Sequence, residues 1–251
     1  MTAIYEPKGR ALEYSGLAIN QYLGCEHGCR YCYAANIVQQ MGLPVGSVKA
    51  RTEILNDLKK QAPKFAGDKR RVLLSFLSDP YPSFESEIHL TRQIMEILTQ
   101  HQIAYQVLTK AGMAAALDFD RYTKHDMFAT TLTFPDAKRS REWEPGAAEP
   151  GLRIASLRNA KACGIRTWAS IEPVIDPAAS LEVMEMAATQ VDLFKIGKLN
   201  HRKNETDWRA FGIAAIELCR KLKKPFFIKH DLAQSLTGYD FVNIDTRFID
   251  D

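Results

Sequence analysis

Cysteine is scarce in this chain and unevenly placed. Only 5 of its 251 residues are cysteines, and three of them fall between positions 25 and 32. Small proteins that depend on disulfides for stability carry many cysteines for their length, usually in an even number. The low count argues against a disulfide scaffold and directs attention to the three clustered thiols.

The sequence also lacks a long apolar run and a strong excess of one charge. No stretch approaches the roughly 18 apolar residues that a membrane span requires. The formal net charge of +3 permits a nucleic-acid partner without requiring one. The first residues do not follow the basic-then-apolar order of a secretion signal, and free thiols suit a reducing compartment. We therefore expect a cytoplasmic protein with no membrane partner.

No linker rich in Pro, Gly or Ser divides the chain. Its content of 46% hydrophobic and 25% charged residues is typical of a globular protein with a substantial core. We expect a single domain over residues 1–251. Within it, the sequence predicts a polar, irregular N-terminal extension at 1–15, a core at 16–229 and a C-terminal tail at 230–251.

The clustered cysteines have the spacing C-x3-C-x2-C, formed by Cys25, Cys29 and Cys32. A cubane [4Fe–4S] cluster normally takes four thiolates, so three leave one iron open to a small molecule. A structural zinc site also needs four ligands, and His27 is the one further candidate within the loop. No second C-x2-C or H-x3-H follows. The motif therefore favours a [4Fe–4S] cluster over zinc, which stays the alternative.

Apolar runs alternate with helical patterns along most of the chain. Near-continuous apolar runs are typical of parallel strands that are buried on both faces. Six strand–helix units and one further strand predict an α/β fold, a partial (β/α)6 barrel with a possible extra edge strand. The predicted strands are 17–22, 71–77, 104–109, 127–134, 167–171, 191–196 and 225–229. The predicted helices are 33–41, 51–60, 90–100, 113–122, 152–163, 178–188 and 207–222.

A long polar loop is predicted at 135–150. We expect its glutamates, among them Glu144, to offset the positive charge of Arg139 and Arg141. These arginines, with Trp143 and with residues 201–203, are the candidates for a basic strip that could bind nucleic acid. The alternative is that the loop is a solvent-exposed lid.

Polar residues follow several predicted strands. The carboxyl ends of parallel strands share one rim, so these side chains are expected to converge there. Buried charges need partners or a ligand. Lys110 could bind a carboxylate, and Ser78 or Asp79 could accept a hydrogen bond from an ammonium. The alternative is that Lys110 and Glu172 pair with each other across the rim.

The cysteine loop resembles the cluster loop of the radical S-adenosylmethionine (SAM) enzymes, whose pattern C-x3-C-x-aromatic-C has Tyr31 at the aromatic position. From about Ser15 to Lys229, further motifs look like those of the spore photoproduct lyase branch, often labelled DNA repair photolyase-like. These motifs are Ser78-Asp79-Pro80-Tyr81, Leu108-Thr109-Lys110, Ser170-Ile171-Glu172-Pro173, Lys195-Ile196-Gly197 and Asn200-His201.

The resemblance implies a radical SAM enzyme. SAM would bind the open iron and, after reduction by a partner such as flavodoxin or ferredoxin, yield a 5'-deoxyadenosyl radical that abstracts hydrogen from a substrate. Ser78 and Lys110 would contact the methionine end of SAM, Tyr31 the adenine, and Asn200 the ribose or the carboxylate. The predicted metal ligands are Cys25, Cys29 and Cys32. The predicted cofactor-binding residues are Tyr31, Ser78, Asp79, Lys110, Glu172, Lys195 and Asn200.

Two departures limit what the resemblance implies. The Gly-Gly-Glu run that many radical SAM enzymes carry after the second strand is absent. The lyases place a hydrogen-donating cysteine on that segment, whereas residues 74–79 here contain none. Cys163 and Cys219 fall near the ends of predicted outer helices, where we expect buried structural thiols. Thymine-dimer repair therefore does not carry over. The substrate stays open, with nucleic acid as one alternative and a non-catalytic metal-binding module as another.

Overall fold

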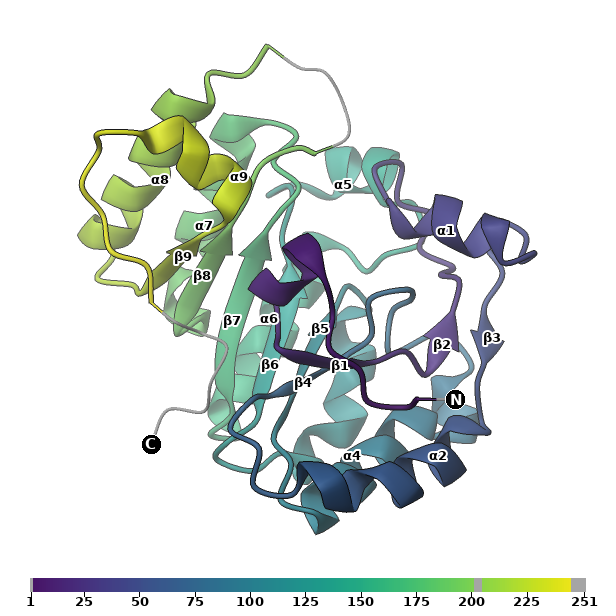
Figure 1. Cartoon of the computed structure of the whole chain (residues 1–251). Helices are drawn as coiled ribbons and strands as arrows, with labels where there is room; N and C mark the ends of the chain where they lie inside the picture. The colour runs from purple at the N-terminus through teal and green to yellow at the C-terminus, as the bar shows by residue number, and fades with distance from the viewer. Residues whose placement is uncertain (1, 201–204, 245–251) are drawn as a thin grey trace.

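The fold is built on one seven-stranded sheet, seen in a computed structural model that describes residues 2–200 and 205–244. All neighbouring strands pair in parallel, in the order β1-β4-β5-β6-β7-β8-β9 (Figure 1). Each corresponds to one predicted strand, and β9 lies at the edge. The α/β prediction is confirmed. The strands are β1 (Leu17–Ile19), β4 (Val72–Leu74), β5 (Tyr105–Thr109), β6 (Met127–Thr131), β7 (Arg166–Ile171), β8 (Leu193–Ile196) and β9 (Phe226–Ile228).

Strand register separates two faces of the sheet. Side chains of paired residues point to the same face, and alternate residues point to opposite faces. Leu74 pairs with Val107 in the large core cluster that the helices cover. On the other face, Ala129, Trp168 and Leu193 form a second, smaller cluster. This second face carries the site.

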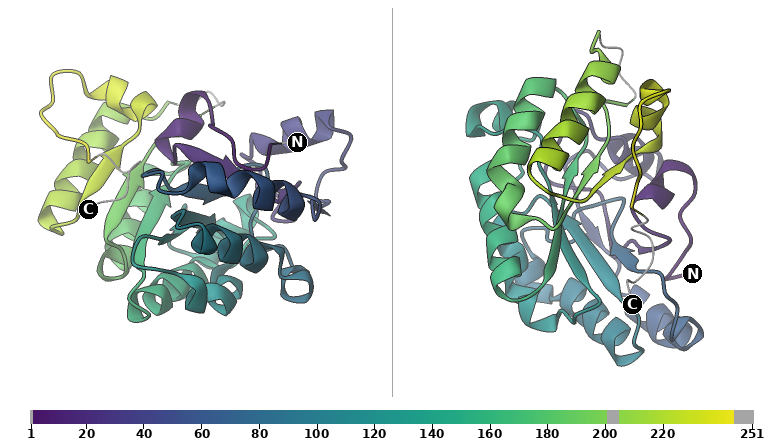
Figure 2. Two further views of the ribbon diagram at one scale, coloured as in Figure 1. Left: turned by 60° about the horizontal axis from the view of Figure 1, so that its bottom comes forward. Right: turned by 90° about the vertical axis from the view of Figure 1, so that its left-hand side faces the viewer.

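Most of the helices cover one side of the sheet, as the right-hand view of Figure 2 shows. Aspartates cap two of the longer ones: Asp176 accepts from Ala179 N at 3.1 Å, and Asp207 accepts from Ala210 N at 2.9 Å. The α-helices are α1 (Ala34–Gln40), α2 (Ile54–Gln61), α3 (Glu85–Ile88), α4 (Leu90–Gln100), α5 (Ala137–Trp143), α6 (Pro150–Ala162), α7 (Pro177–Ala187), α8 (Trp208–Lys221) and α9 (His230–Ala233). The 3-10 helices are η1 (Gly9–Glu13), η2 (Ala62–Phe65), η3 (Gly112–Arg121), η4 (Ala188–Gln190) and η5 (Gln234–Leu236). Within the described residues, none of these helices has the length and apolar character needed to cross a bilayer.

Several sequence predictions are corrected. The stretch 135–150 is not a loop throughout, because Asp136 caps the short helix α5. The helix predicted at 113–122 is a 3-10 helix, η3. Cys219 is buried as expected, but Cys163 is exposed at the end of α6, so its predicted burial is wrong. The sequence also gave no indication of the antiparallel pair β2 (Tyr22–Leu23) and β3 (Lys49–Ala50).

The N-terminal extension is not irregular throughout, because it forms η1 and crosses the face of the sheet opposite the covering helices (Figures 1 and 2). Tyr5 forms a β-bridge with Ala18 of β1. Arg10 forms an ion pair with Asp231 of α9, beyond β9. The extension therefore connects the two edges of the sheet. At the β9 edge, Asn243 of the C-terminal tail bonds both backbone groups of Ile228, at 2.7 and 2.8 Å.

Candidate functional site

The cysteine loop follows β2 through a turn that only glycine can make. Gly24 has φ of +79°, and a Cβ there would lie 2.1 Å from the carbonyl oxygen of Ser47. The three thiols of Cys25, Cys29 and Cys32 are reduced and half-buried. The Cys32 amide donates to the Cys29 carbonyl at 3.1 Å, which tightens the end of the loop.

Residues 143–148, here called the brace, hold the cysteine loop in place. The Arg30 amide donates to the Trp143 carbonyl at 2.9 Å, and the Gly146 amide donates to the His27 carbonyl at 2.9 Å. A Cβ at Gly146 would lie 2.4 Å from the Glu26 carbonyl oxygen, so the close approach depends on glycine. The brace belongs to the stretch predicted as an exposed loop, and its contacts with the cysteine loop replace that interpretation.

Glu144 of the brace is buried, contrary to its expected exposure. It forms an ion pair with Arg153 of α6 at 2.7 Å, and both side chains are at most 1% exposed. The hydroxyls of Tyr31 and Thr133 also donate to this carboxylate. Burial works to raise the pKa of Glu144, but Arg153 and Lys110 outweigh it and lower the pKa. Tyr31 is therefore tied, through an ionised glutamate, to the helix behind it.

Lys110 lies beside the cysteine loop at the end of β5. Its carbonyl accepts from the Ala148 amide of the brace at 2.9 Å, and its Nζ lies 5.6 Å from the centre of the Tyr31 ring. Burial works to lower the pKa of this ammonium, but Cys29 and Glu144 outweigh it and raise the pKa. A half-buried cation is thus held next to the thiols.

Ser78 and Asp79 lie on the loop that follows β4. Asp79 accepts from the Thr109 hydroxyl at 2.6 Å and from the Lys110 amide at 2.8 Å, so it joins this loop to the end of β5. The Oγ of Ser78 is buried and has no hydrogen-bond partner in the described structure. Unpaired buried hydroxyls are costly and rare in native proteins, which is a reason to expect a ligand here.

The donor set near the loop fits an iron–sulfur cluster with one open iron. Three thiols come from one loop, and Lys110 supplies a positive charge that would offset an anionic cluster. His27, the alternative fourth ligand, has its Nδ1 3.6 Å from the Asp79 carboxylate. Across residues 2–200 and 205–244, no three His, Cys, Asp or Glu side chains are arranged to hold a metal ion as they stand. The metal ligands stay a prediction.

A second polar group surrounds Glu172, at the end of β7. Its carboxylate accepts from the Tyr14 hydroxyl at 2.6 Å, from the Lys229 ammonium and from the Asn200 amide at 3.1 Å. Burial lowers the pKa of Lys229, and Glu172 opposes this. A Cβ at Gly197 would lie 2.4 Å from the Glu172 carboxylate, so glycine leaves room for the group. The alternative pairing of Lys110 with Glu172 is wrong, because Glu172 pairs with Lys229.

Lys195 is buried on β8 within the same region. Its Nζ donates to the Tyr14 carbonyl at 3.0 Å and lies 4.5 Å from the centre of the Trp168 ring. The predicted cofactor-binding residues thus divide into two sets. Tyr31, Ser78, Asp79 and Lys110 lie beside the cysteine loop, and Glu172, Lys195 and Asn200 lie around Tyr14.

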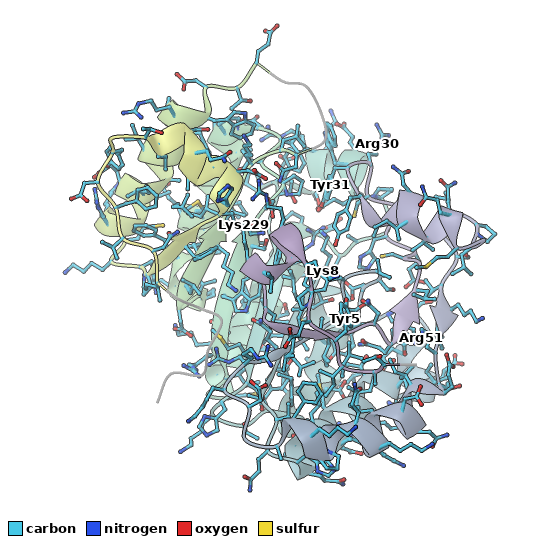
Figure 3. All side chains as sticks on the ribbon, in the orientation of Figure 1. Tyr5, Lys8, Arg30, Tyr31, Arg51 and Lys229 are labelled. Atoms are coloured by element: carbon cyan, nitrogen blue, oxygen red, sulfur yellow. The ribbon has the colours of Figure 1, made fainter. Side chains whose placement is uncertain are left out.

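Tyr14 connects the two sets. Its ring packs edge-on against Phe76, two residues before Ser78, at 6.0 Å between centroids. In Figure 3, Lys229 lies on the β9 side of the N-terminal segment and Tyr31 lies on the α1 side. No motif or spacing in the sequence pointed to Tyr14 or Arg153. Lys229 could have been found, because it is the last residue of a predicted strand and so belongs to the same rim.

The two arginines of the candidate basic strip already lie close to carboxylates. Arg139 forms ion pairs with Asp136 at 2.7 Å and Asp176 at 2.8 Å. Arg141 is exposed and lies 3.7 Å from Glu149. Trp143 is half-buried at the end of α5, and residues 201–203 lie outside the described residues.

Sequence comparison finds relatives without an assigned activity, and no protein-family model matches the chain. An uncharacterized protein of Methanocaldococcus jannaschii is 29% identical over 167 residues, which cover 65% of this chain and 62% of the relative. An uncharacterized protein of Mycobacterium tuberculosis H37Rv is 25% identical over 179 residues, covering 67% of this chain and 52% of the relative. The chain therefore spans about half to three fifths of the length of these relatives.

Solved structures share the fold. Spore photoproduct lyase in complex with a dinucleoside spore photoproduct aligns over 90% of this chain and 79% of its own, with a TM-score of 0.69 and 13% identity. A mutant of that lyase with bound AdoMet has a TM-score of 0.70. SuiB of Streptococcus suis bound to S-adenosylmethionine aligns over 90% of this chain and 53% of its own, with a TM-score of 0.66 and 13% identity. The chain has the fold of these radical SAM enzymes, and the predicted resemblance is confirmed at the level of the fold.

Proposed function

We propose that this protein is a radical SAM enzyme that binds a [4Fe–4S] cluster through Cys25, Cys29 and Cys32. The observation that carries the proposal is a loop with three free thiols, fixed by the brace, next to a half-buried lysine and an unpaired serine hydroxyl. When bound, the cluster would supply the electron that cleaves SAM reductively to methionine and a 5'-deoxyadenosyl radical.

The residues beside the cysteine loop suit the methionine end of SAM. Lys110 would bind its carboxylate, because an ammonium that is partly removed from water favours an anionic partner. The Ser78 hydroxyl would bond the amino acid part of SAM and so gain the partner that it lacks. Asp79 already accepts from the Thr109 hydroxyl and the Lys110 amide, so its role would be to fix the position of Lys110 and to attract the SAM ammonium.

The second polar group would face the rest of the cofactor and the substrate. Tyr31, which belongs to the set beside the cysteine loop, would lie along the adenine and is held by its hydrogen bond to Glu144. Asn200, Glu172 and Lys195 would contribute polar contacts to the ribose or to the substrate. Because these groups satisfy one another in the structure, a ligand that binds them must replace the bonds it displaces.

The decisive experiment is SAM cleavage. The protein is reconstituted anaerobically with iron and sulfide, then treated with dithionite and SAM, and 5'-deoxyadenosine is measured. We expect formation by the wild type and by Cys163→Ala, whose thiol is exposed and outside the loop, and none by Cys29→Ala. A fully loaded wild-type protein that forms no 5'-deoxyadenosine would contradict the proposal and favour a non-catalytic metal-binding module.

Nucleic acid is the alternative substrate class, supported by the shared fold with a lyase that was solved with a dinucleoside photoproduct. Deuterium-labelled DNA and RNA would show whether label reaches the 5' carbon of deoxyadenosine. Absence of both label transfer and salt-dependent binding would rule this alternative out.

A further inference from the structure

The segment after the cysteine loop presents apolar side chains to solvent. Tyr33, Ile37, Met41 and Val45 are 49%, 36%, 56% and 65% exposed. The first three are spaced four residues apart on and beside α1, so they lie along one side of it. We call these four side chains the α1 face. Neighbouring apolar side chains that stay exposed commonly mark a contact surface.

Among the helices and strands of the described residues, none covers α1 on its outer side. In Figures 1 and 2, α1 lies to one side of the sheet, apart from the helices that pack on it. Its buried positions are Ala34 and Val38, which face the rest of the molecule. Two helix residues thus hold α1 in place, and the α1 face stays available.

The segment that carries this surface has charged residues of one sign. Between Glu26 and Glu53 the sequence contains no acidic residue, while Arg30 and Lys49 are exposed at the two ends of the segment. Charges at the edge of an interface select partners of opposite sign and speed their association. An acidic partner fits this surface better than a basic one.

The position of the α1 face indicates what such a partner would deliver. Tyr33 directly follows Cys32, and α1 begins one residue later. The patch consists of four side chains, and electron-transfer complexes have interfaces at the small end of the known range, below about 1,200 Å². A surface of this size, next to the proposed cluster ligands, suits a short-lived redox encounter.

We propose that the α1 face is the docking surface for an acidic one-electron carrier protein of the flavodoxin or ferredoxin class. This inference rests on the proposed function. One electron passes from the reduced carrier to the cluster, and no bond is formed or broken in the transfer. The apolar side chains provide the contact, and Arg30 and Lys49 orient the carrier.

The test compares two reductants on the reconstituted full chain. The double variant Met41→Glu/Val45→Glu places negative charge on the α1 face. The control is Met186→Glu on α7, which is equally apolar and 47% exposed. Cluster reduction is followed by absorbance with reduced flavodoxin and, separately, with dithionite. Calorimetry measures the binding of oxidised flavodoxin to the unreduced protein.

We expect the double variant to be reduced by flavodoxin roughly tenfold more slowly, and to bind it more weakly, because like charges oppose the encounter. Its reduction by dithionite should match that of the wild type, and Met186→Glu should match the wild type in every assay. An unchanged flavodoxin rate would overturn the docking surface, as would equal slowing by both reductants. Loss of self-association or of nucleic-acid binding alone, with the flavodoxin rate unchanged, would also overturn it and assign the surface to that partner. Failure of the wild type to form 5'-deoxyadenosine with dithionite would instead contradict the proposed function.

Discussion

Glu144 is the residue on which the position of the cysteine loop most depends. It joins Tyr31 of that loop, Thr133 after β6 and Arg153 of α6 in one buried group. Because Arg153 belongs to α6, the packing of this helix helps to fix where the cysteine loop lies. The arrangement contains a buried ion pair, and removing either partner would leave the other charge buried without compensation.

Replacing Glu144 with alanine should therefore be severe. The change leaves the Arg153 guanidinium buried without its counter-charge, and we expect the free energy of unfolding to fall by about 3–5 kcal/mol. Anaerobic urea denaturation measures this. Glu142→Ala, two residues earlier and exposed, is the matched control and should change stability by less than about 0.5 kcal/mol. Equal effects of the two changes would contradict the role given to Glu144.

Glu85, which lies outside the cysteine loop, makes the unfolding free energy depend on pH. Burial raises its pKa to about 7 from an ordinary value of 4.5, while the Tyr22 hydroxyl and Thr91 amide oppose the shift and Asp118 adds to it. The folded state therefore holds this proton more tightly than the unfolded state. The stabilisation is complete below about pH 4.5 and is lost as the pH rises through about 7.

Urea denaturation at about pH 5 and about pH 8 tests this. The wild type should lose about 2–3 kcal/mol more than Glu85→Gln between these two values, because glutamine has no proton to release. The variant is its own control for the other titrating groups. Parallel pH profiles of the two proteins would show that Glu85 does not titrate in this range.

At the scale of elements, the N-terminal segment is a structural part of the site. It carries Tyr14 across the sheet, where the ring contacts Phe76 and Trp168 and the hydroxyl donates to Glu172. The Tyr14 carbonyl also accepts from Lys195 and, at 2.7 Å, from Gln106. One residue of this segment thus contacts several strands.

Tyr14→Ala should accordingly cost about 3 kcal/mol in unfolding free energy, from lost packing and from partners left unpaired. Leu12→Ala changes an exposed residue of the adjoining helix η1 and should cost less than about 1 kcal/mol. Thermal or urea unfolding distinguishes the two. A tolerated Tyr14→Ala would mean that the segment only lies over the sheet.

In the molecule as a whole, the candidate site is formed by the cysteine loop, the ends of several strands and α6. A ligand that contacts all of them should stabilise the entire fold. SAM at about 100 times its dissociation constant should add about 2.7 kcal/mol to the unfolding free energy of the reconstituted protein. Cys29→Ala, which lacks a proposed ligand, should gain much less, and equal stabilisation would show that SAM does not bind through the cluster.

Local pattern in the sequence was enough to predict the strands and most of the longer helices, because apolar runs and helical spacing are local properties. It failed for α5 and for the exposure of Glu144. A charged residue in a polar stretch is expected to be exposed, and only its contact with Arg153 on the following helix reverses that expectation. The pairing of Glu172 was missed for the same reason, since Lys229 lies 57 positions further along the chain.

The order of residue types is enough to establish the chemistry available to this protein: three thiols at a fixed spacing, an aromatic residue between two of them, and polar residues after parallel strands. Residue type and short spacing suffice for that, because covalent geometry limits where near neighbours can lie. The tertiary structure decided which of these groups meet. It placed Lys110 beside the thiols, gave Glu172 to Lys229 and buried Glu144 against Arg153, because contacts between distant residues depend on how the strands and helices pack.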